Sequence, residues 1–201
     1  MDQRINNRGV LVDMQMAQNA IALDAKVKSE LSSRMKELTG LENPNSVQQL
    51  SRWLKDHGAS LPSLGKKDVQ EALKTAKDPV KEVLQLRLML SKSSVKKYQA
   101  MLTSACSDHR CRGMFTFAAT KTLRWAGRIV QLQNLPQNHL SSLAEARTLV
   151  RNGDLDSLGM LYDDIPDTLS QLIRTAFIPK PGYLFYVADF SSIECRWKIP
   201  S

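Results

Sequence analysis

The stretch from Met14 to Gly40, "MQMAQNAIALDAKVKSELSSRMKELTG", decides the expected fold. Apolar residues recur in it at spacings of three and four, namely Met16, Ala20, Leu23, Val27, Leu31, Met35 and Leu38. This apolar stripe follows the 3.6-residue period of an α-helix, so it predicts one long amphipathic helix with a single buried face. Gly40 suits the left-handed position that commonly ends a helix.

A second stripe of the same period predicts a partner helix. Its members are Val80, Leu84, Leu88, Ser91, Val95, Tyr98 and Leu102. Asp78 suits the N-cap of this helix and Pro79 suits its first turn. Two helices of about 25 residues would each be nearly 40 Å long, and their facing stripes predict a long antiparallel hairpin.

Shorter helices are expected in the connection, between residues 46 and 78. In "NPNSVQQLSRWLKDHG", Ser46 is the expected cap, Gln49 completes a capping box and Gly58 is a stop signal. A Pro/Gly-rich loop and a second short, basic helix follow. These helices are predicted to form the tip of the hairpin, far from the C-terminal segment.

The character of the sequence changes after Leu102. "RGMFTFAAT" predicts a strand, "GRIVQLQNLP" an extended segment, and residues 141–164 one or two surface helices. A Pro-Gly turn then precedes an apolar stretch at residues 183–188, which predicts a buried strand. The expected fold class is α+β and predominantly α, with a helical hairpin over residues 1–104 and a few short strands within residues 105–201.

The distribution of charge favours a polyanionic partner. The net charge is +8, of which residues 1–151 carry +11 and residues 152–201 carry −3. A basic body of this kind is typical of nucleic-acid-binding proteins, although a basic protein without such a partner is the simple alternative. No run of 18 apolar residues and no secretory signal occurs in the sequence, so no membrane partner is expected.

The cysteines favour a reducing, cytoplasmic setting. Cys106, Cys111 and Cys195 are odd in number and form no disulfide framework. "CSDHRC" brings His109 between the first two, but structural zinc needs four ligands, usually in two paired clusters. The sequence has no second cluster, so zinc is not expected, and Cys195 is interpreted as a small core residue.

The segment "YLFYVADFSSIECR", residues 183–196, carries the most specific chemistry. Asp189 stands where the apolar stretch meets a polar turn, and a carboxylate there could bind Mg²⁺ or could simply cap the turn. The order of residues from Asp189 to Arg196 resembles motif A of family A DNA polymerases. Four further segments of that family, in the family's order, are resembled by "INNRGVLVD", "LTGLENPNSVQQLSRWLKDHG", "GRIVQLQNLP" and "LIRTAFIPKPGY". The form of "RWAGRIVQLQNLP" is closer to the phage and prophage branch than to the long bacterial repair enzyme.

This resemblance covers nearly all 201 residues. It implies a thumb over residues 1–104 and the start of a palm over residues 105–201, in an enzyme that synthesises DNA on a template. It also implies that Asp189 binds the catalytic Mg²⁺, that Glu194 packs under the sugar of the incoming nucleotide, and that Arg196 lies with it at the nucleotide site. Arg128, Gln133 and Asn134 match the segment that reaches the minor groove near the primer end, where acceptor atoms are common to all base pairs.

The lysines of the hairpin are candidates for phosphate contacts. They are Lys66 and Lys67 near the tip and Lys92, Lys96 and Lys97 on the second arm. The alternative is that they only decorate solvated helix faces. Arg174 also matches a position of the family pattern. For Arg128 and Arg174 the alternative is a structural role, ion pairing with Asp163, Asp164 or Asp167.

Three features depart from the family pattern. Leu123 stands where a glycine is more usual, and residues 138–168 resemble an insertion. The sequence also has neither the nucleotide-binding helix of the fingers nor the His-Asp-Glu turn with the second metal-binding aspartate. Because two-metal phosphoryl transfer needs both carboxylates, this chain is expected to be inactive alone. Its expected partners are primer–template DNA and, in the complete enzyme, a deoxynucleoside triphosphate.

Two other functions fit the same residues. A non-catalytic module could bind duplex DNA through the basic hairpin without any metal. A structural fragment could instead dock on a separately encoded chain that carries the fingers and the rest of the palm.

Overall fold

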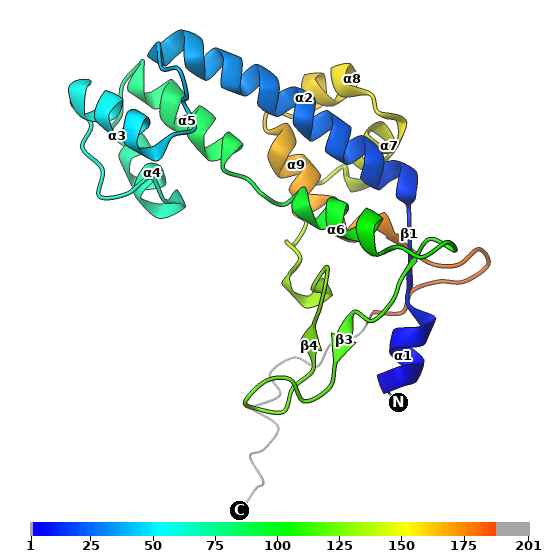
Figure 1. Ribbon diagram of the computed structural model, residues 1–201. Helices are drawn as coiled ribbons and strands as arrows, with labels where there is room; N and C mark the ends of the chain where they lie inside the picture. Colours follow the sequence, from blue (N-terminus) through cyan, green and yellow to red (C-terminus); the bar gives the residue numbers. More distant parts are fainter. Residues whose placement is uncertain (1, 188–201) are drawn as a thin grey trace, which may run out of the picture.

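The computed structural model describes residues 2–187, and within that range it has nine α-helices, of which α2 is the longest (Figure 1). The α-helices are α1 Asp2–Arg8, α2 Met14–Thr39, α3 Val47–Asp56, α4 Lys66–Leu73, α5 Val80–Leu90, α6 Lys96–Ser104, α7 Leu143–Asn152, α8 Leu155–Leu161 and α9 Ile165–Gln171. Two 3₁₀ turns, η1 Leu132–Asn134 and η2 Ile173–Ala176, and five strands complete the order: β1 Val10–Val12, β2 Arg110–Cys111, β3 Phe115–Thr116, β4 Ala126–Gly127 and β5 Phe177–Ile178. The predicted fold class, α+β and mainly α, is confirmed.

Helix α2 confirms the first predicted arm. It has 26 residues, which corresponds to a length of about 39 Å. At its start the side chain of Asp13 accepts a hydrogen bond from the Met16 N–H at 3.1 Å. At its end Gly40 adopts the left-handed conformation, with φ 66°, and its N–H bonds the carbonyl of Lys36.

The second arm is broken, and here the prediction of one helix from residue 80 to residue 102 was wrong. Helix α5 ends at Leu90 and α6 begins at Lys96. The intervening sequence is rich in serine, and serine hydroxyls compete with the backbone for hydrogen bonds. Ser91 Oγ donates to the carbonyl of Leu88, and Ser94 Oγ is bonded to Ser170 Oγ of α9. Tertiary contacts at the break therefore replace helix propagation.

Two predicted helix caps also differ from the structure. Pro79 itself takes the N-cap position of α5 and supplies no side-chain cap, so Asp78 is not the cap. Ser46 does cap α3, by accepting from the Gln49 N–H, but the Gln49 side chain accepts from the Asn43 N–H instead of from Ser46. The capping box is therefore only half formed, because the chain before Ser46 turns and presents another donor to the glutamine.

The strands form one small sheet and one hairpin. The sheet has the order β2-β1-β5, all antiparallel, with Val10 opposite Cys111 and Leu11 opposite both Arg110 and Ile178. Strands β3 and β4 pair as an antiparallel hairpin, in which Phe115 is opposite Gly127. This sheet joins the start of α2 to segments that lie more than 90 residues later in the chain.

The predicted buried strand at residues 183–188 is not formed in its described part. Residues 183–187 have no strand pairing, and Tyr186 and Val187 are more than nine-tenths exposed. A strand needs a neighbour to satisfy its N–H and C=O groups, and no described segment pairs with these residues. Residue 188 lies outside the described part.

Buried apolar side chains form two separate clusters. The tip cluster joins the C-terminal half of α2 to α3, α4 and α5; its buried members are Met35, Leu50, Trp53, Leu54, Val69, Val80, Val83, Leu84 and Leu86. The base cluster joins the N-terminal half of α2 to α6, α7, α8, α9 and the sheet. Helix α2 contributes side chains to both clusters. In Figure 1 it extends from β1 and α7 at one end to α3 and α5 at the other.

The base cluster corrects the prediction that residues 141–164 form surface helices. Helices α7 and α8 were expected on the surface, yet Ala146, Val150 and Leu158 are fully buried in the base cluster. Tyr98 of α6 lies in the same cluster as Cys111, so one core spans the predicted boundary at residue 104. The division into thumb and palm stays a prediction.

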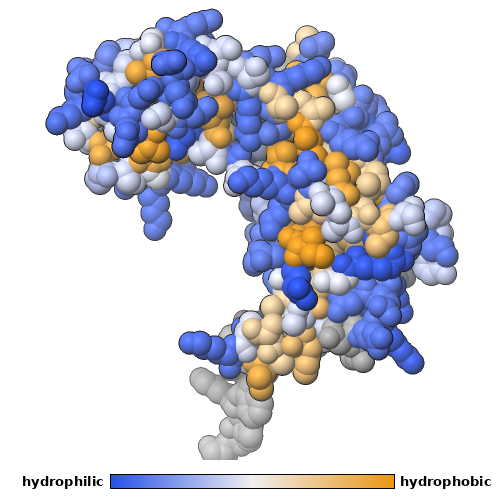
Figure 2. Space-filling view, in the orientation of Figure 1, coloured by the Kyte–Doolittle hydropathy of each residue, from blue (hydrophilic) through white to orange (hydrophobic). Residues whose placement is uncertain are grey.

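The space-filling view shows a hollow on one side of the molecule, between the tip and the lower end (Figure 2). Hydrophilic side chains cover most of the tip in this view, with apolar patches between them. Within residues 2–187, none of the helices combines the length and hydropathy needed to cross a membrane.

Candidate nucleic-acid interface

The tip presents its cations at the start of a helix. Lys66 and Lys67 are exposed in the first turn of α4, whose N-cap Gly65 provides no side-chain cap. Cations at a helix N-terminus oppose the helix dipole, at a cost of about 0.3–1 kcal/mol each. Asp68 in the same turn offsets part of this cost, and Ser63 Oγ donates to it at 2.5 Å. The two lysines therefore stay available to an external anion.

The three predicted lysines of the second arm differ in whether their ammonium groups already have partners. Lys96 is exposed and has no ion pair among the described residues. Lys97 is half-buried, and its Nζ donates to the carbonyl of Val130 at 2.8 Å. Lys92 is held in ion pairs with Asp164 and Asp167, at 3.0 and 2.5 Å. Of the three, Lys96 is thus the one whose ammonium is unoccupied within the described part.

The predicted minor-groove residues lie together after the β3–β4 hairpin. Arg128, Gln133 and Asn134 are all exposed, and the Arg128 N–H bonds the carbonyl of Met114. Gln133 lies directly over Gly127: a Cβ at residue 127 would come within 2.2–2.6 Å of the Gln133 side-chain amide. The glycine therefore makes room for the glutamine.

Arg174 has a positioning role that the sequence did not reveal. Its guanidinium donates to the carbonyls of Leu135 and Pro136, at 2.8 and 3.0 Å. It does not pair with Asp163, Asp164 or Asp167, the alternative considered from the sequence. The segment that carries Gln133 and Asn134 is thereby fixed to the 3₁₀ turn η2.

A basic hollow beside the sheet was missed by the sequence reasoning. It has a volume of about 590 Å³, and its charged lining residues are Arg8, Arg110, Arg112 and Lys180. Arg112 makes a bidentate ion pair with Asp108, and hydrogen bonds from this guanidinium lower the pKa of Asp108 to about 2. Arg110 donates to the carbonyls of Arg8 and Gly9 at the end of α1. The lining also includes Tyr183, Leu184 and Phe185, which come shortly before Asp189 in the sequence.

The two cysteines of the "CSDHRC" segment, which was considered as a zinc site, differ in their exposure. Cys111 is buried, with its thiol 3.2 Å from Ser104 Oγ, and burial raises the pKa of that thiol. Cys106 is exposed. In residues 2–187, no group of three His, Cys, Asp or Glu side chains lies close enough to hold a metal ion.

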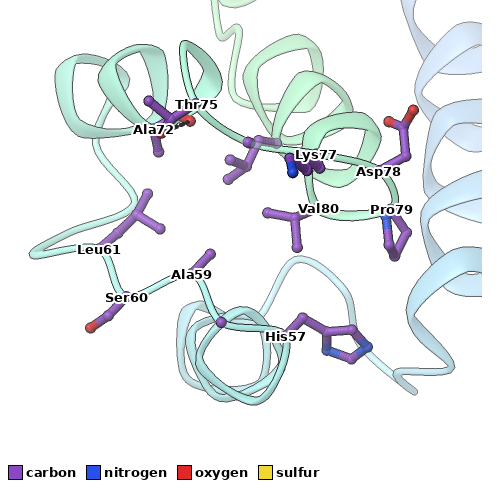
Figure 3. A pocket seen from close by; sticks show the side chains of 13 residues that line it. His57, Ala59, Ser60, Leu61, Ala72, Thr75, Lys77, Asp78, Pro79 and Val80 are labelled. Carbon is purple, nitrogen blue, oxygen red and sulfur yellow. Dashed lines mark hydrogen bonds between the residues drawn. The ribbon is translucent and has the colours of Figure 1, made fainter.

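A further hollow lies in the tip, between the ends of α3 and α4 and the start of α5 (Figure 3). It encloses about 420 Å³ and is lined mainly by small and apolar side chains such as Ala59, Leu61 and Val80. His57 stacks on Trp53 with their ring centroids 3.9 Å apart, and Trp53 packs in the tip cluster. Lys77 and Asp78 are opposite charges in the lining, so this hollow lacks the cationic character of a phosphate site.

Asp189, Glu194 and Arg196 lie outside the described residues, as does Cys195. Their roles in metal and nucleotide binding therefore remain predictions.

Two comparisons with known proteins bear on this geometry. The family model for DNA polymerase family A matches residues 14–198. A DNA polymerase of Bacillus phage SP02 is 48% identical over 198 residues, which is 98% of this chain and 31% of the phage protein. The chain thus spans about a third of the length of that curated relative.

Proposed function

Because the chain belongs to DNA polymerase family A, we propose that it forms the part of a template-directed DNA polymerase that holds the primer–template duplex. The observation that carries this proposal is the 48% identity, along almost the whole chain, to a phage protein named as a DNA polymerase. In this proposal α2 to α6 form the thumb, and the segments after residue 104 begin the palm.

The phosphates of the duplex would contact the exposed cations. Lys66 and Lys67 on the tip and Lys96 on the second arm are the first candidates, since their ammonium groups are exposed. Each lysine that neutralises a phosphate releases a counterion, which makes the affinity depend on salt. Lys92 and Lys97 need to leave their present partners before they can do the same.

Arg128, Gln133 and Asn134 would lie in the minor groove near the primer end. This assignment is supported by the exposure of all three side chains on one short segment. Arg174 anchors one end of that segment, and the β3–β4 hairpin anchors the other. Polar side chains held in this way can bond the acceptor atoms that every base pair presents in the minor groove. Such contacts test base pairing without reading sequence.

Magnesium belongs to this proposal through Asp189. The proposal assigns the ion to this aspartate because residues 189–196 resemble motif A of the family, with Glu194 and Arg196 directed to the nucleotide. When bound, Mg²⁺ would neutralise charge on the phosphates during phosphoryl transfer. Two-metal transfer needs a second carboxylate motif, and the 201-residue sequence contains none, so we expect the isolated chain to bind DNA without extending a primer. A separately encoded fingers–palm chain has no support from the comparisons.

Binding of a fluorescent primer–template duplex, measured by anisotropy at several salt concentrations, tests the proposal. We expect a plot of log affinity against log salt with a slope of about −3 from three phosphate contacts, and Lys66→Ala with Lys67→Ala should make it about 1.8 less steep. Lys26→Ala with Lys36→Ala is the matched control, because it removes the same charge from exposed sites on α2. An equal effect of both pairs would contradict the assignment of the interface to the tip.

The second candidate, a duplex-binding module without catalysis, makes the same binding prediction. It is favoured by the exposed lysines Lys66, Lys67 and Lys96, which can neutralise phosphates without any metal. Primer extension with Mg²⁺ and four deoxynucleoside triphosphates separates the two once the chain is joined to the remaining length of its phage relative. Templated extension by that chimera, abolished by Asp189→Asn, supports the polymerase, and extension that survives the substitution refutes the role of Asp189.

A further inference from the structure

Lys92 lies at the break between α5 and α6, where the tip and base clusters meet. Its Nζ is 3.0 Å from Asp164 Oδ2 and 2.5 Å from Asp167 Oδ1, and a quarter of its side chain is exposed. Its carbonyl accepts a hydrogen bond from Lys28, which in turn pairs with the buried Asp24 of α2. The break is therefore tied on one side to α2 and on the other to α9.

The two carboxylates are held in place by α9 itself. Asp164 is the N-cap of that helix, and its Oδ1 accepts from the Asp167 N–H at 2.8 Å. Asp167 Oδ2 accepts from Gln171 Nε2 at 2.6 Å. All four carboxylate oxygens thus have a partner, which is a helix N–H, Gln171 or Lys92, and both acids line the same polar hollow.

That hollow also contains a lysine from the tip. It encloses about 560 Å³, and its lining includes Lys66 and Gln70 of α4 together with Lys92, Asp164 and Asp167. Burial alone would raise the pKa of Asp167, but hydrogen bonds from Lys92 and Gln171, with the charges of Lys92 and Lys66, lower it overall. The positive charge of Lys66, in the tip, therefore acts on Asp167, in the base of the molecule.

Carboxylate oxygens resemble phosphate oxygens in charge and in the donors that they attract. Two of the lysines assigned to DNA phosphates thus already face a pair of anions supplied by the chain. We propose that Asp164 and Asp167 form an autoinhibitory latch, which occupies Lys92 until the phosphates of a duplex displace the two carboxylates. The inference rests on the proposed duplex binding and adds an internal competitor to it.

The junction does not depend on the latch for its integrity. Tyr98 Oη donates to the carbonyl of Leu169 at 2.8 Å, and Ser94 and Ser170 are hydrogen-bonded at 2.8 Å. These contacts keep α6 against α9 when the ion pairs open. Exposed and half-exposed ion pairs are weak in water, so phosphates can compete with them.

The test compares two doubly substituted chains that lose the same charge. Asp164→Asn with Asp167→Asn removes the latch and keeps the cap of α9, because asparagine is also a good N-cap. Asp156→Asn with Asp163→Asn, at neighbouring exposed sites, is the control. Anisotropy with a primer–template duplex should give about two- to five-fold tighter binding for the latch variant than for the control. The slope against log salt should be steeper by about 0.9 for each lysine released.

A third variant tests whether Lys92 is the lysine that gains phosphate contacts when the latch is removed. Lys92→Gln, added to the latch variant, should abolish at least half of the gain on a logarithmic scale, whereas Lys26→Gln should leave the gain intact. If the double variant fails to fold, as judged by circular dichroism, Asp167→Asn alone serves with Asp163→Asn as its control. Equal affinities of latch and control variants overturn the latch and leave the proposed function standing. An absence of duplex binding by every chain overturns both.

Discussion

Loss of the Asp13 side chain should weaken the base of the molecule. It is 7% exposed, caps α2 through the Met16 N–H, and pairs with Arg147 at 2.7 Å and Arg151 at 3.1 Å. Its own N–H bonds the carbonyl of Ala176. One side chain thus connects the start of α2 to α7, and the same residue is the last of the "GVLVD" segment.

The expected magnitude follows from these contacts. Replacing a cap by alanine costs about 1 kcal/mol. The two arginines are 30% and 50% exposed and can return to water, so losing their partner costs about 1–2 kcal/mol, less than the cost of breaking a fully buried pair. Asp13→Ala should therefore lower the free energy of unfolding by about 2–3 kcal/mol. Asp13→Asn, which keeps a cap, should lower it by about 1–2 kcal/mol.

Urea unfolding followed by circular dichroism at 222 nm measures both variants. Adding Arg147→Met to each of them completes a double-mutant cycle, and we expect a coupling of at least about 0.5 kcal/mol between Asp13 and Arg147. An Asn variant as stable as the wild type would refute the contribution of the ion pairs. Equal losses for Ala and Asn would refute the contribution of the cap.

Three further predictions concern stability. Tyr98→Phe, which leaves the carbonyl of Leu169 without its donor, should cost about 1–2 kcal/mol in urea unfolding, whereas Tyr186→Phe at an exposed site should cost less than about 0.5 kcal/mol. Gly9→Ala should cost at least about 2 kcal/mol, because φ is +60° and a Cβ would lie 2.5 Å from the Cys111 carbonyl oxygen; Gly113→Ala, with φ +67° and open space, should cost only about 1 kcal/mol. The ion pair with Arg112 lowers the pKa of Asp108 to about 2, so its contribution is complete above the unfolded value near 4 and is lost as the pH falls from about 4 to about 2. Thermal unfolding of Asp108→Asn should lack this part of the pH dependence, and parallel curves for variant and wild type would contradict it.

The helical parts of the fold could be predicted where a local pattern determines them. The stripe from Met16 to Leu38 and the glycine at residue 40 specify α2 by themselves, because period and cap agree. The break at residues 91–95 could not be read from periodicity, since Val95 and Tyr98 continue the stripe. It depends on Lys92 and Ser94 meeting α9, which lies some 70 residues later.

The candidate site was predictable only in part, for a related reason. Residue type and resemblance selected Lys66, Lys67 and Lys96, and the structure leaves these exposed. Whether a given lysine is occupied depends on acids that are distant in sequence, as Lys92 illustrates. Arg174 gave no local signal, because its partners are backbone carbonyls, which every residue has.

The continuity of α2 has a mechanical consequence. A single rigid rod of about 39 Å carries one hydrophobic cluster at each end, so a small rotation at the base becomes a large displacement at the far end. A tilt of roughly 10° about Asp13 would swing the opposite end through about 7 Å, which is about twice the roughly 3.4 Å axial spacing of phosphates along one strand of a DNA duplex. Helix α2 would then act as a lever, through which side-chain rearrangements near the sheet displace the tip with its lysines Lys66 and Lys67.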